Sequence, residues 1–257
     1  MVPSSKVTMT ALTGIKLVEP GDDLGGITVG AFIANGLVPE AGDVLVVAQK
    51  VVSKAEDRYV DVATVHPSEK AIALAAELDK DPRFVEVVLS ESKRVVRHRP
   101  GLLIVEHRLG YVMANAGIDH SNVPTQDGAE RVLLLPEDPD GSARVLRERF
   151  SVAAGGDVAV IVADTFGRPW REGLTNIAIG VAGFAPLKSY LGERDPAGRP
   201  LQATILALAD ELASAAEPVM GKLDRVPAAI VRGLPLPPDD GSGSKTLLRD
   251  PARDLFR

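Results

Sequence analysis

Cysteine is absent from the 257 residues, and histidine occurs only four times. The lack of cysteine excludes disulfides, thiolate-bound zinc, iron–sulfur clusters and a cysteine nucleophile. The four histidines are not spaced as an HExxH zinc motif requires. Any metal bound by this chain is therefore expected to be a hard cation held by oxygen ligands.

Long apolar runs and an excess of positive charge are also lacking. The longest apolar stretches, such as VAVIVA at 158–163, fall far short of the roughly 20 residues that a membrane-spanning helix needs. The N-terminal segment has no apolar core of a secretion signal, so we expect a cytoplasmic protein. A net charge of -6 and an aromatic content of 4% argue against a general nucleic-acid binder.

Three common nucleotide-binding and catalytic motifs are missing. The nearest approach to a P-loop is AEPVMGKL at 216–223, where Ala216 replaces the first glycine and Leu223 replaces the serine or threonine. No GxGxxG follows an apolar strand pattern, and no GxSxG is present. A Walker, Rossmann or serine-hydrolase site is therefore unsupported.

Strand and helix patterns alternate loosely along the chain. Short apolar runs predict strands within 7–15, 43–53, 102–114, 157–165 and 227–234. Periodic patterns predict helices within 67–80, 81–98, 139–150 and 201–222, and Ser142 is expected to cap the third. This order favours a mixed α/β or α+β fold in one domain, 1–257. Residues 233–245 are interpreted as a linker or surface loop, and 246–257 as a tail that docks back.

Two carboxylates follow buried strand patterns. Asp119 comes after one apparent strand, and Asp164 with Thr165 is expected to end another. Ligands of α/β proteins bind at such carboxyl edges, and two carboxylates can hold Mg²⁺ or Mn²⁺ beside phosphate oxygens. Thr165 can add a hydroxyl ligand, and Asn122 can hydrogen-bond a nucleotide or sugar. The alternative is that both aspartates only cap turns or helices.

Several cationic residues are candidates for binding anions. Arg168 and Arg171 are interpreted as lying one helical turn apart, either facing an anionic ligand or solvated beside Glu172. Trp170 is expected in the core or in a dimer contact. The lysines in 49–54 either meet a phosphate or protect an edge strand. The basic patch at 93–99 is explained by a helix C-terminus, which favours cations.

Five longer segments together resemble one family, the coenzyme F(420)-0:L-glutamate ligases, or γ-glutamyl ligases. They are VLVVAQKVVSKAEDR, NAGIDHSNV, LLPEDPDGSARVLRERF, VIVADTFGRPWREG and ADELASAAEPVMGK, in this order. The resemblance implies the family's own mixed α/β fold and an intertwined homodimer. It also implies a GTP-dependent ligase that adds one and then further L-glutamates to coenzyme F(420)-0 and releases GDP and phosphate. The implied ions are Mg²⁺ or Mn²⁺, two per site, with K⁺ as a further candidate.

Positions matching the family's motifs carry expected roles. Asp119 and Asp164 would bind one metal, and Thr165 a second. The segments expected to contact the nucleotide contain Ile15, Lys16, Leu17, Val18, Gln49, Lys50, Lys54, Asn122, Met220, Gly221 and Lys222. Arg168 and Arg171 are candidates for binding the acceptor substrate, and no catalytic residue is assigned.

The chain departs from the archaeal pattern at two places. Gln49 and Lys50 stand where archaeal members have a Ser-Thr pair, and Lys222 stands where they place an acidic metal ligand. An ammonium cannot coordinate a cation, so either Lys222 contacts phosphate or the second metal is held differently. Two other functions stay open: an amide ligase of the same fold acting on another acid, and a non-catalytic metal- or deazaflavin-binding protein.

Overall fold

The structure is a computed structural model that describes residues 6–119 and 130–255. Its centre is a five-stranded sheet in the order β1-β12-β2-β8-β9, in which only the β2–β8 pair is parallel. The strands are β1 (Thr8–Ala11), β2 (Val44–Ala48), β8 (Ala159–Arg168), β9 (Arg171–Ala182) and β12 (Ala228–Arg232). The predicted mixed α and β architecture is confirmed.

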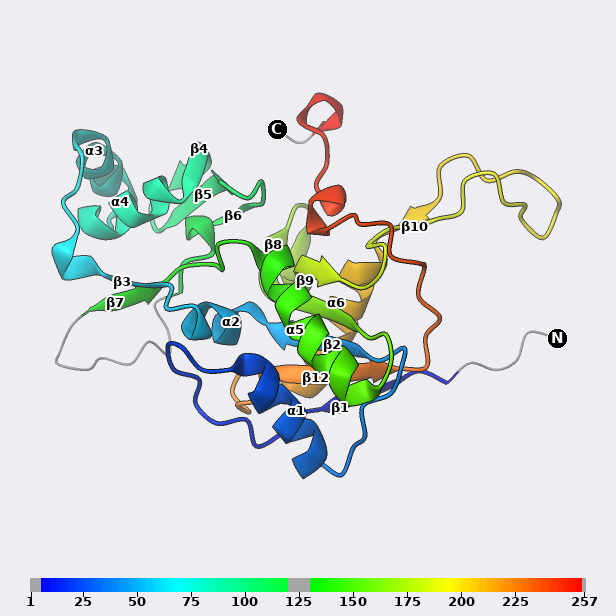
Figure 1. Ribbon diagram of the computed structural model, residues 1–257. Helices are drawn as coiled ribbons and strands as arrows, with labels where there is room; N and C mark the ends of the chain where they lie inside the picture. Colours follow the sequence, from blue (N-terminus) through cyan, green and yellow to red (C-terminus); the bar gives the residue numbers. More distant parts are fainter. Residues whose placement is uncertain (1–5, 120–129, 256–257) are drawn as a thin grey trace.

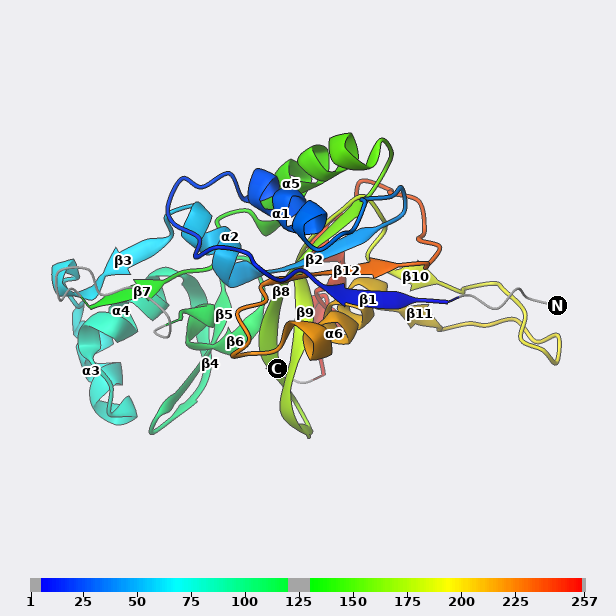
Figure 2. The ribbon, with the colours of Figure 1, turned by 90° about the horizontal axis from the view of Figure 1, so that it is seen from below.

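Helices cover both faces of this sheet (Figure 2). One face carries α1 (Leu24–Ala34) and α5 (Pro139–Ala154), and the other carries α6 (Leu208–Met220). Leu45 and Val47 of β2 belong to the core under α1 and α5. Val44 and Val46 belong to the core under α6. Since alternate side chains of a strand point to opposite faces, burial on both faces explains the unbroken apolar runs in the sequence.

A smaller lobe lies beside the central sheet and has its own core (Figure 1). It contains α3 (Glu69–Leu78), α4 (Pro82–Ser90), β4 (Ser92–Arg99), β5 (Leu102–His107) and β6 (Val112–Ala114), with the short helices η1 (Val62–Thr64) and η2 (Asn115–Gly117). The pair β3 (Tyr59–Asp61) and β7 (Arg131–Leu133) joins this lobe to the centre, after α2 (Gln49–Ala55).

The remaining elements lie at the periphery. The short pair β10 (Lys188–Ser189) and β11 (Ile205–Leu206) forms the base of an arm that extends away from the sheet (Figure 1). Two turns, η3 (Ser244–Leu247) and η4 (Pro251–Arg253), follow β12. Residue Ser244 is buried, and its backbone N–H donates to Asp140 Oδ1 at 3.0 Å. This contact fixes the segment after 233–243 against the start of α5.

Three predicted elements are wrong in their extent or type. The helix expected over 81–98 ends at Ser90, and the basic residues 93–99 lie on β4. The helix-dipole explanation of the basic patch is therefore wrong, because these cations lie on a strand that pairs with β5. The strand expected over 102–114 is two strands joined by a turn. Ser142 does not cap α5 but lies inside it, where its hydroxyl donates to the Asp138 carbonyl at 3.1 Å.

Gly180 shows how closely β9 packs on α5, and Trp170 shows that the turn of the β8–β9 hairpin is open to solvent. A Cβ on Gly180 would lie 2.2 Å from the Pro139 carbonyl oxygen, so the start of α5 packs directly on the β9 backbone. Only glycine, which has no Cβ, leaves room for this approach. Trp170 is 85% exposed at the hairpin turn, with a φ of 64°, so it is not part of the core.

Candidate functional site

The carboxyl end of the parallel pair β2–β8 gathers several of the predicted site residues. Ala48 ends β2 opposite Ala163 of β8. After Ala48 the chain turns directly into α2, whose first residues are Gln49 and Lys50. Strand β8 instead continues through Asp164 and Thr165, paired with β9. The ligand edge predicted from the sequence is therefore the place where β2 stops and β8 leaves the central sheet.

Two sequence interpretations change here. Asp164 does not end its strand, because β8 runs on to Arg168 as one arm of a long hairpin. Residues 49–55 are helix α2 rather than strand, and β2 lies between β12 and β8. The idea that Lys50 and Lys54 protect an edge strand is therefore wrong. Lys54 is instead buried, and burial, followed by the charge of Lys50, lowers the pKa of its ammonium.

Asp119 reaches this edge from the smaller lobe. It follows η2 and forms a two-way backbone bridge with Leu133, the last residue of β7. Its carboxylate accepts a hydrogen bond from Gln49 Nε2 at 3.1 Å and lies 3.3 Å from Lys50 Nζ. The buried Gln49 amide is itself oriented by Ser53 Oγ, which donates to Gln49 Oε1 at 2.9 Å. The structure thus brings Asp119 to Gln49, 70 positions earlier in the sequence, and to the neighbouring Lys50.

Asp164 interacts electrostatically with Asp119. Burial, reinforced by the negative charge of Asp119, raises the pKa of the Asp164 carboxyl to about 7. Hydrogen bonding to the Thr165 backbone and the charges of Lys222 and Lys50 oppose this rise. A carboxylate whose ionised form is disfavoured by burial and by a second carboxylate is stabilised by a shared cation.

Asp119 and Asp164 therefore fit a divalent metal. Across residues 6–119 and 130–255, His, Asp and Glu side chains form no group of three that could hold an ion. Two protein carboxylates are nevertheless sufficient for Mg²⁺, which keeps several waters and takes further ligands from substrate phosphates. The chemistry of this pair suits a hard divalent ion that keeps several water ligands.

Thr165 has a different environment, formed by β9 and the end of α6. Its hydroxyl donates to Asn176 Oδ1 at 2.8 Å and accepts a hydrogen bond from Lys222 Nζ. Asn176 Nδ2 donates to Glu217 Oε2 at 2.6 Å, and Lys222 Nζ lies 3.2 Å from Glu217 Oε1. An ammonium therefore already occupies the surroundings of Thr165, and these surroundings do not fit a second metal as they stand.

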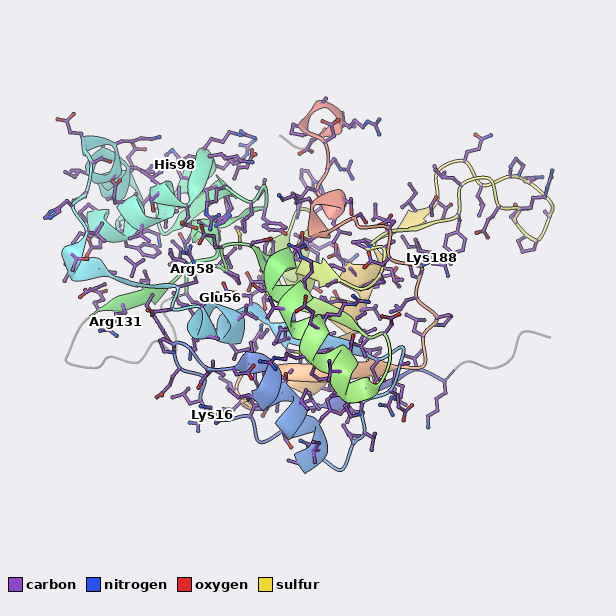
Figure 3. The ribbon with its side chains drawn as sticks, viewed as in Figure 1. Lys16, Glu56, Arg58, His98, Arg131 and Lys188 are labelled. Atoms are coloured by element: carbon purple, nitrogen blue, oxygen red, sulfur yellow. The ribbon has the colours of Figure 1, made fainter. Side chains whose placement is uncertain are left out.

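Most of the other predicted nucleotide-binding residues lie at the end of α6 or in the loop between β1 and α1. Met220 is buried under the central sheet and Gly221 ends α6, so both position Lys222. The loop with Ile15, Lys16, Leu17 and Val18 lies between β1 and α1 and is held to α2 by the hydrogen bond from Gly21 N to Ala55 O, 2.9 Å. Figure 3 shows Lys16 in this loop, apart from the smaller lobe that carries His98. Asn122 lies outside the described residues.

Arg168 and Arg171 face each other across the β8–β9 turn and not along a helix. Arg168 Nη2 donates to the Glu172 carbonyl at 3.2 Å, and its buried Nε has no hydrogen-bond partner among the described residues. Arg171 is exposed. Their role in binding an acceptor stays a prediction.

Asn176 and Glu217 were missed by the sequence reasoning. Asn176 is buried in β9, within the glycine-rich and largely apolar run 173–187. A lone amide inside such a run was an available signal, because a buried amide needs hydrogen-bond partners. Glu217 lies in α6 beside Pro218, and its position next to Thr165 depends on the crossing of α6 and β9, which no local pattern reveals.

Comparisons with known proteins identify the family of this chain. The sequence model of the family described as F420-0:Gamma-glutamyl ligase matches residues 14–233. A protein of Methanopyrus kandleri named coenzyme F420:L-glutamate ligase is 47% identical over 244 residues, covering 93% of both chains. A protein of the same name from Methanothermobacter thermautotrophicus is 43% identical over 254 residues, covering 98% of this chain and 99% of its own. The chain belongs to the F420-0:gamma-glutamyl ligase family.

Proposed function

We propose that this protein is a GTP- and divalent-metal-dependent ligase that joins L-glutamate to coenzyme F(420)-0 and then adds further γ-linked glutamates. The observation that carries the proposal is the meeting of Asp119 and Asp164, from separate lobes, beside Lys50 at the carboxyl end of β2 and β8. The names of the similar proteins support the same acceptor and amino acid. Mg²⁺ or Mn²⁺ would serve as the metal, with K⁺ as a further candidate ion.

The proposed reaction has two group transfers. An acceptor carboxylate oxygen attacks the γ-phosphorus of GTP, the bond to the bridging oxygen breaks, and GDP leaves with that electron pair. The amine nitrogen of glutamate then attacks the acyl carbon, phosphate leaves, and the amine proton passes to solvent. Such transfers depend on positioning and on neutralising charge.

The chain's own residues suit these tasks. A metal bound by Asp119 and Asp164 would neutralise phosphate charge when present. Gln49 fixes the orientation of Asp119, because the Gln49 amide is locked by Ser53. Lys50 provides a cation 3.3 Å from Asp119 that can also attract phosphate oxygens. Carboxylates and lysines at one edge thus form a site for a metal-bound polyphosphate.

Mass spectrometry of the reaction products tests this proposal. The protein is incubated with F(420)-0, GTP, L-glutamate and Mn²⁺, and a ladder of glutamate-sized mass increments is expected. The Asp119→Asn variant should lose the ladder, because the amide keeps the shape of the side chain but removes a metal ligand. Asp79→Asn is the matched control: Asp79 is exposed at the end of α3 with a φ of 53°, a conformation that asparagine tolerates.

The outcomes separate the alternatives. No mass increase despite GTP binding would refute F(420)-0 as the acceptor and favour an amide ligase for another acid. Binding of metal and F(420)-0 without any GTP hydrolysis would favour a non-catalytic binding protein. Ligation that survives Asp119→Asn would refute the metal role of this carboxylate.

We also propose that the protein forms an intertwined homodimer. In support, the β10–β11 arm projects from the body (Figure 1) and exposes Leu191 and Ile205, and the β8–β9 hairpin exposes Leu174. Apolar side chains on projecting segments are typical of surfaces that pack against another chain. Light scattering after gel filtration should give twice the chain mass, and deletion of 190–204 should give the monomer mass.

A further inference from the structure

Four side chains around Thr165 form a closed ring of contacts. Thr165 Oγ1 donates to Asn176 Oδ1 at 2.8 Å, and Asn176 Nδ2 donates to Glu217 Oε2 at 2.6 Å. Lys222 Nζ closes the ring, because it donates to Thr165 Oγ1 and lies 3.2 Å from Glu217 Oε1. Each of the four side chains therefore contacts two others of the ring.

The local sequence directs Lys222 into this ring. Gly221 ends α6, and its N–H donates to the Glu217 carbonyl at 2.9 Å. With a φ of 64°, Gly221 takes a conformation that favours glycine and turns the chain, so that the next side chain folds back along the helix. A Cβ here would lie 2.2 Å from Asp224 Oδ2, so the turn also lacks room for a larger residue.

The ring contains the oxygen atoms that a cation would use, together with a cation of its own. The Thr165 hydroxyl and the Glu217 carboxylate are oxygen ligands suited to Mg²⁺ or Mn²⁺. Lys222 contacts both of them, and an ammonium neutralises carboxylate charge but cannot coordinate a metal. The buried Asn176 holds the two oxygen-bearing side chains at a fixed spacing, since each end of its amide is bonded to one of them.

We propose that the Lys222 ammonium serves as the fixed cation at Thr165, so that each chain binds a single divalent metal, on Asp119 and Asp164. This inference rests on the proposed function for the first metal and departs from the expectation of two metals per site. Lys222 thereby supplies positive charge beside the nucleotide site without a second ion. Its side chain is 59% exposed, so the same ammonium is accessible to a phosphate oxygen.

Metal stoichiometry tests the proposal without measuring activity. The full chain is titrated with Mn²⁺ alone, and free Mn²⁺ is measured by electron paramagnetic resonance. The wild type should bind about one Mn²⁺ per chain, and Lys222→Arg should do the same because it keeps a cation. Lys222→Glu should bind about two, since it removes the ammonium and adds a carboxylate next to Thr165 and Glu217.

Two controls make the result specific. Lys70→Glu makes the same charge change on the exposed surface of α3 and should still bind about one Mn²⁺. A second ion in Lys222→Glu should be bound much more weakly when Glu217→Gln is added, because only the introduced carboxylate then remains beside Thr165. Thermal unfolding of every variant establishes that the fold is kept.

Each other outcome overturns the inference. About two Mn²⁺ per wild-type chain would refute the single-metal site while leaving the proposed ligase function intact. One Mn²⁺ in Lys222→Glu would show that Lys222 does not stand in for a metal. No Mn²⁺ on the wild type would overturn both this inference and the proposed metal dependence.

Discussion

A buried ion cluster links the smaller lobe to the helix that begins the candidate site. Glu91, between α4 and β4, accepts from Arg108 Nε at 2.9 Å and lies 3.6 Å from Arg58 Nη2 and 3.4 Å from His107 Nε2. The Leu109 N–H donates to His107 Nδ1 at 3.0 Å, which leaves the Nε2 side of the ring facing Glu91. Arg58 follows α2 and donates to the Leu135 carbonyl at 3.0 Å, which ties the cluster to the centre (Figure 3).

Glu91→Gln should destabilise the protein by an amount set by this cluster. Burial alone would raise the pKa of Glu91, but the contacts with His107 and Arg108 outweigh it and lower the pKa from 4.5 to about 2. Each pKa unit corresponds to about 1.4 kcal/mol, so the ionised form contributes roughly 3 kcal/mol of unfolding free energy at pH 7. The side chain is 12% exposed, so solvent screening removes little of this.

The sign of the pH dependence follows from the lowered pKa. The stabilisation is fully present above the unfolded pKa of 4.5 and is lost as the pH falls through the folded value of about 2. At pH 3 roughly 2 kcal/mol of it should already be gone. Urea unfolding of wild type and Glu91→Gln should therefore differ by about 3 kcal/mol at pH 7 and by about 1 kcal/mol at pH 3.

The control is Glu77→Gln, whose side chain is 63% exposed beside His98 and should change stability by less than about 0.5 kcal/mol. A Glu91→Gln variant as stable as the wild type at pH 7 would refute the reasoning, as would a difference that does not shrink toward pH 3. The first result would mean that desolvation of the cluster cancels its attraction. The second would mean that the lost stability does not come from the ionised form of Glu91.

Three further perturbations test other parts of the structure. Because the pKa of Asp164 is raised to about 7, a proton competes with the metal for this carboxylate. The apparent Mn²⁺ affinity measured by calorimetry should therefore rise about tenfold from pH 6 to pH 8. An affinity that does not change with pH would contradict this. Gly180→Ala would place a Cβ 2.2 Å from the Pro139 carbonyl and should cost roughly 1–3 kcal/mol in urea unfolding; an unchanged midpoint would show that α5 shifts freely. Asp43→Asn should lower the free energy of unfolding, measured in urea, by about 3 kcal/mol, because Asp43 is 1% exposed and pairs with Arg232 Nε at 2.6 Å and Nη2 at 2.7 Å. Asp195→Asn, in the arm that projects from the body, is the control variant and should leave this free energy nearly unchanged.

The sequence predicted the central strands β1, β2, β8 and β12, but not β9, and helices cover both faces of this sheet. Burial on two sides requires continuous apolar runs such as Val44–Ala48, and these runs are visible without any knowledge of the fold. The helix expected within 67–80 is equally local, because α3 begins where Ser68 Oγ accepts from the Ala71 N–H at 3.2 Å. Features that depend only on residues adjacent in the sequence could therefore be predicted without knowledge of the fold.

The errors occur where tertiary pairing overrides a local pattern. Residues 92–99 look like the basic end of a helix, yet β4 forms because β5 offers a partner across the turn at Gly101. Asp164 appears to end a strand, because the apolar run stops there. The backbone nevertheless continues as β8, since β9 pairs with it as far as Arg171. Periodicity reports which side chains are buried, whereas hydrogen-bond partners decide where a strand stops.

The carboxylates and ammonium groups of the candidate site nearly compensate one another even without a ligand. Three carboxylates, Asp119, Asp164 and Glu217, lie within electrostatic reach of Lys50 and Lys222. The fixed charges are therefore nearly compensated. Burial, reinforced by the charge of Asp119, nevertheless raises the pKa of Asp164 to about 7, against the opposing charges of Lys222 and Lys50. One divalent ion would convert this balance into a net positive site, which is what a nucleotide triphosphate requires. A second ion would add charge where Lys222 already supplies it, so the lysine makes one metal sufficient.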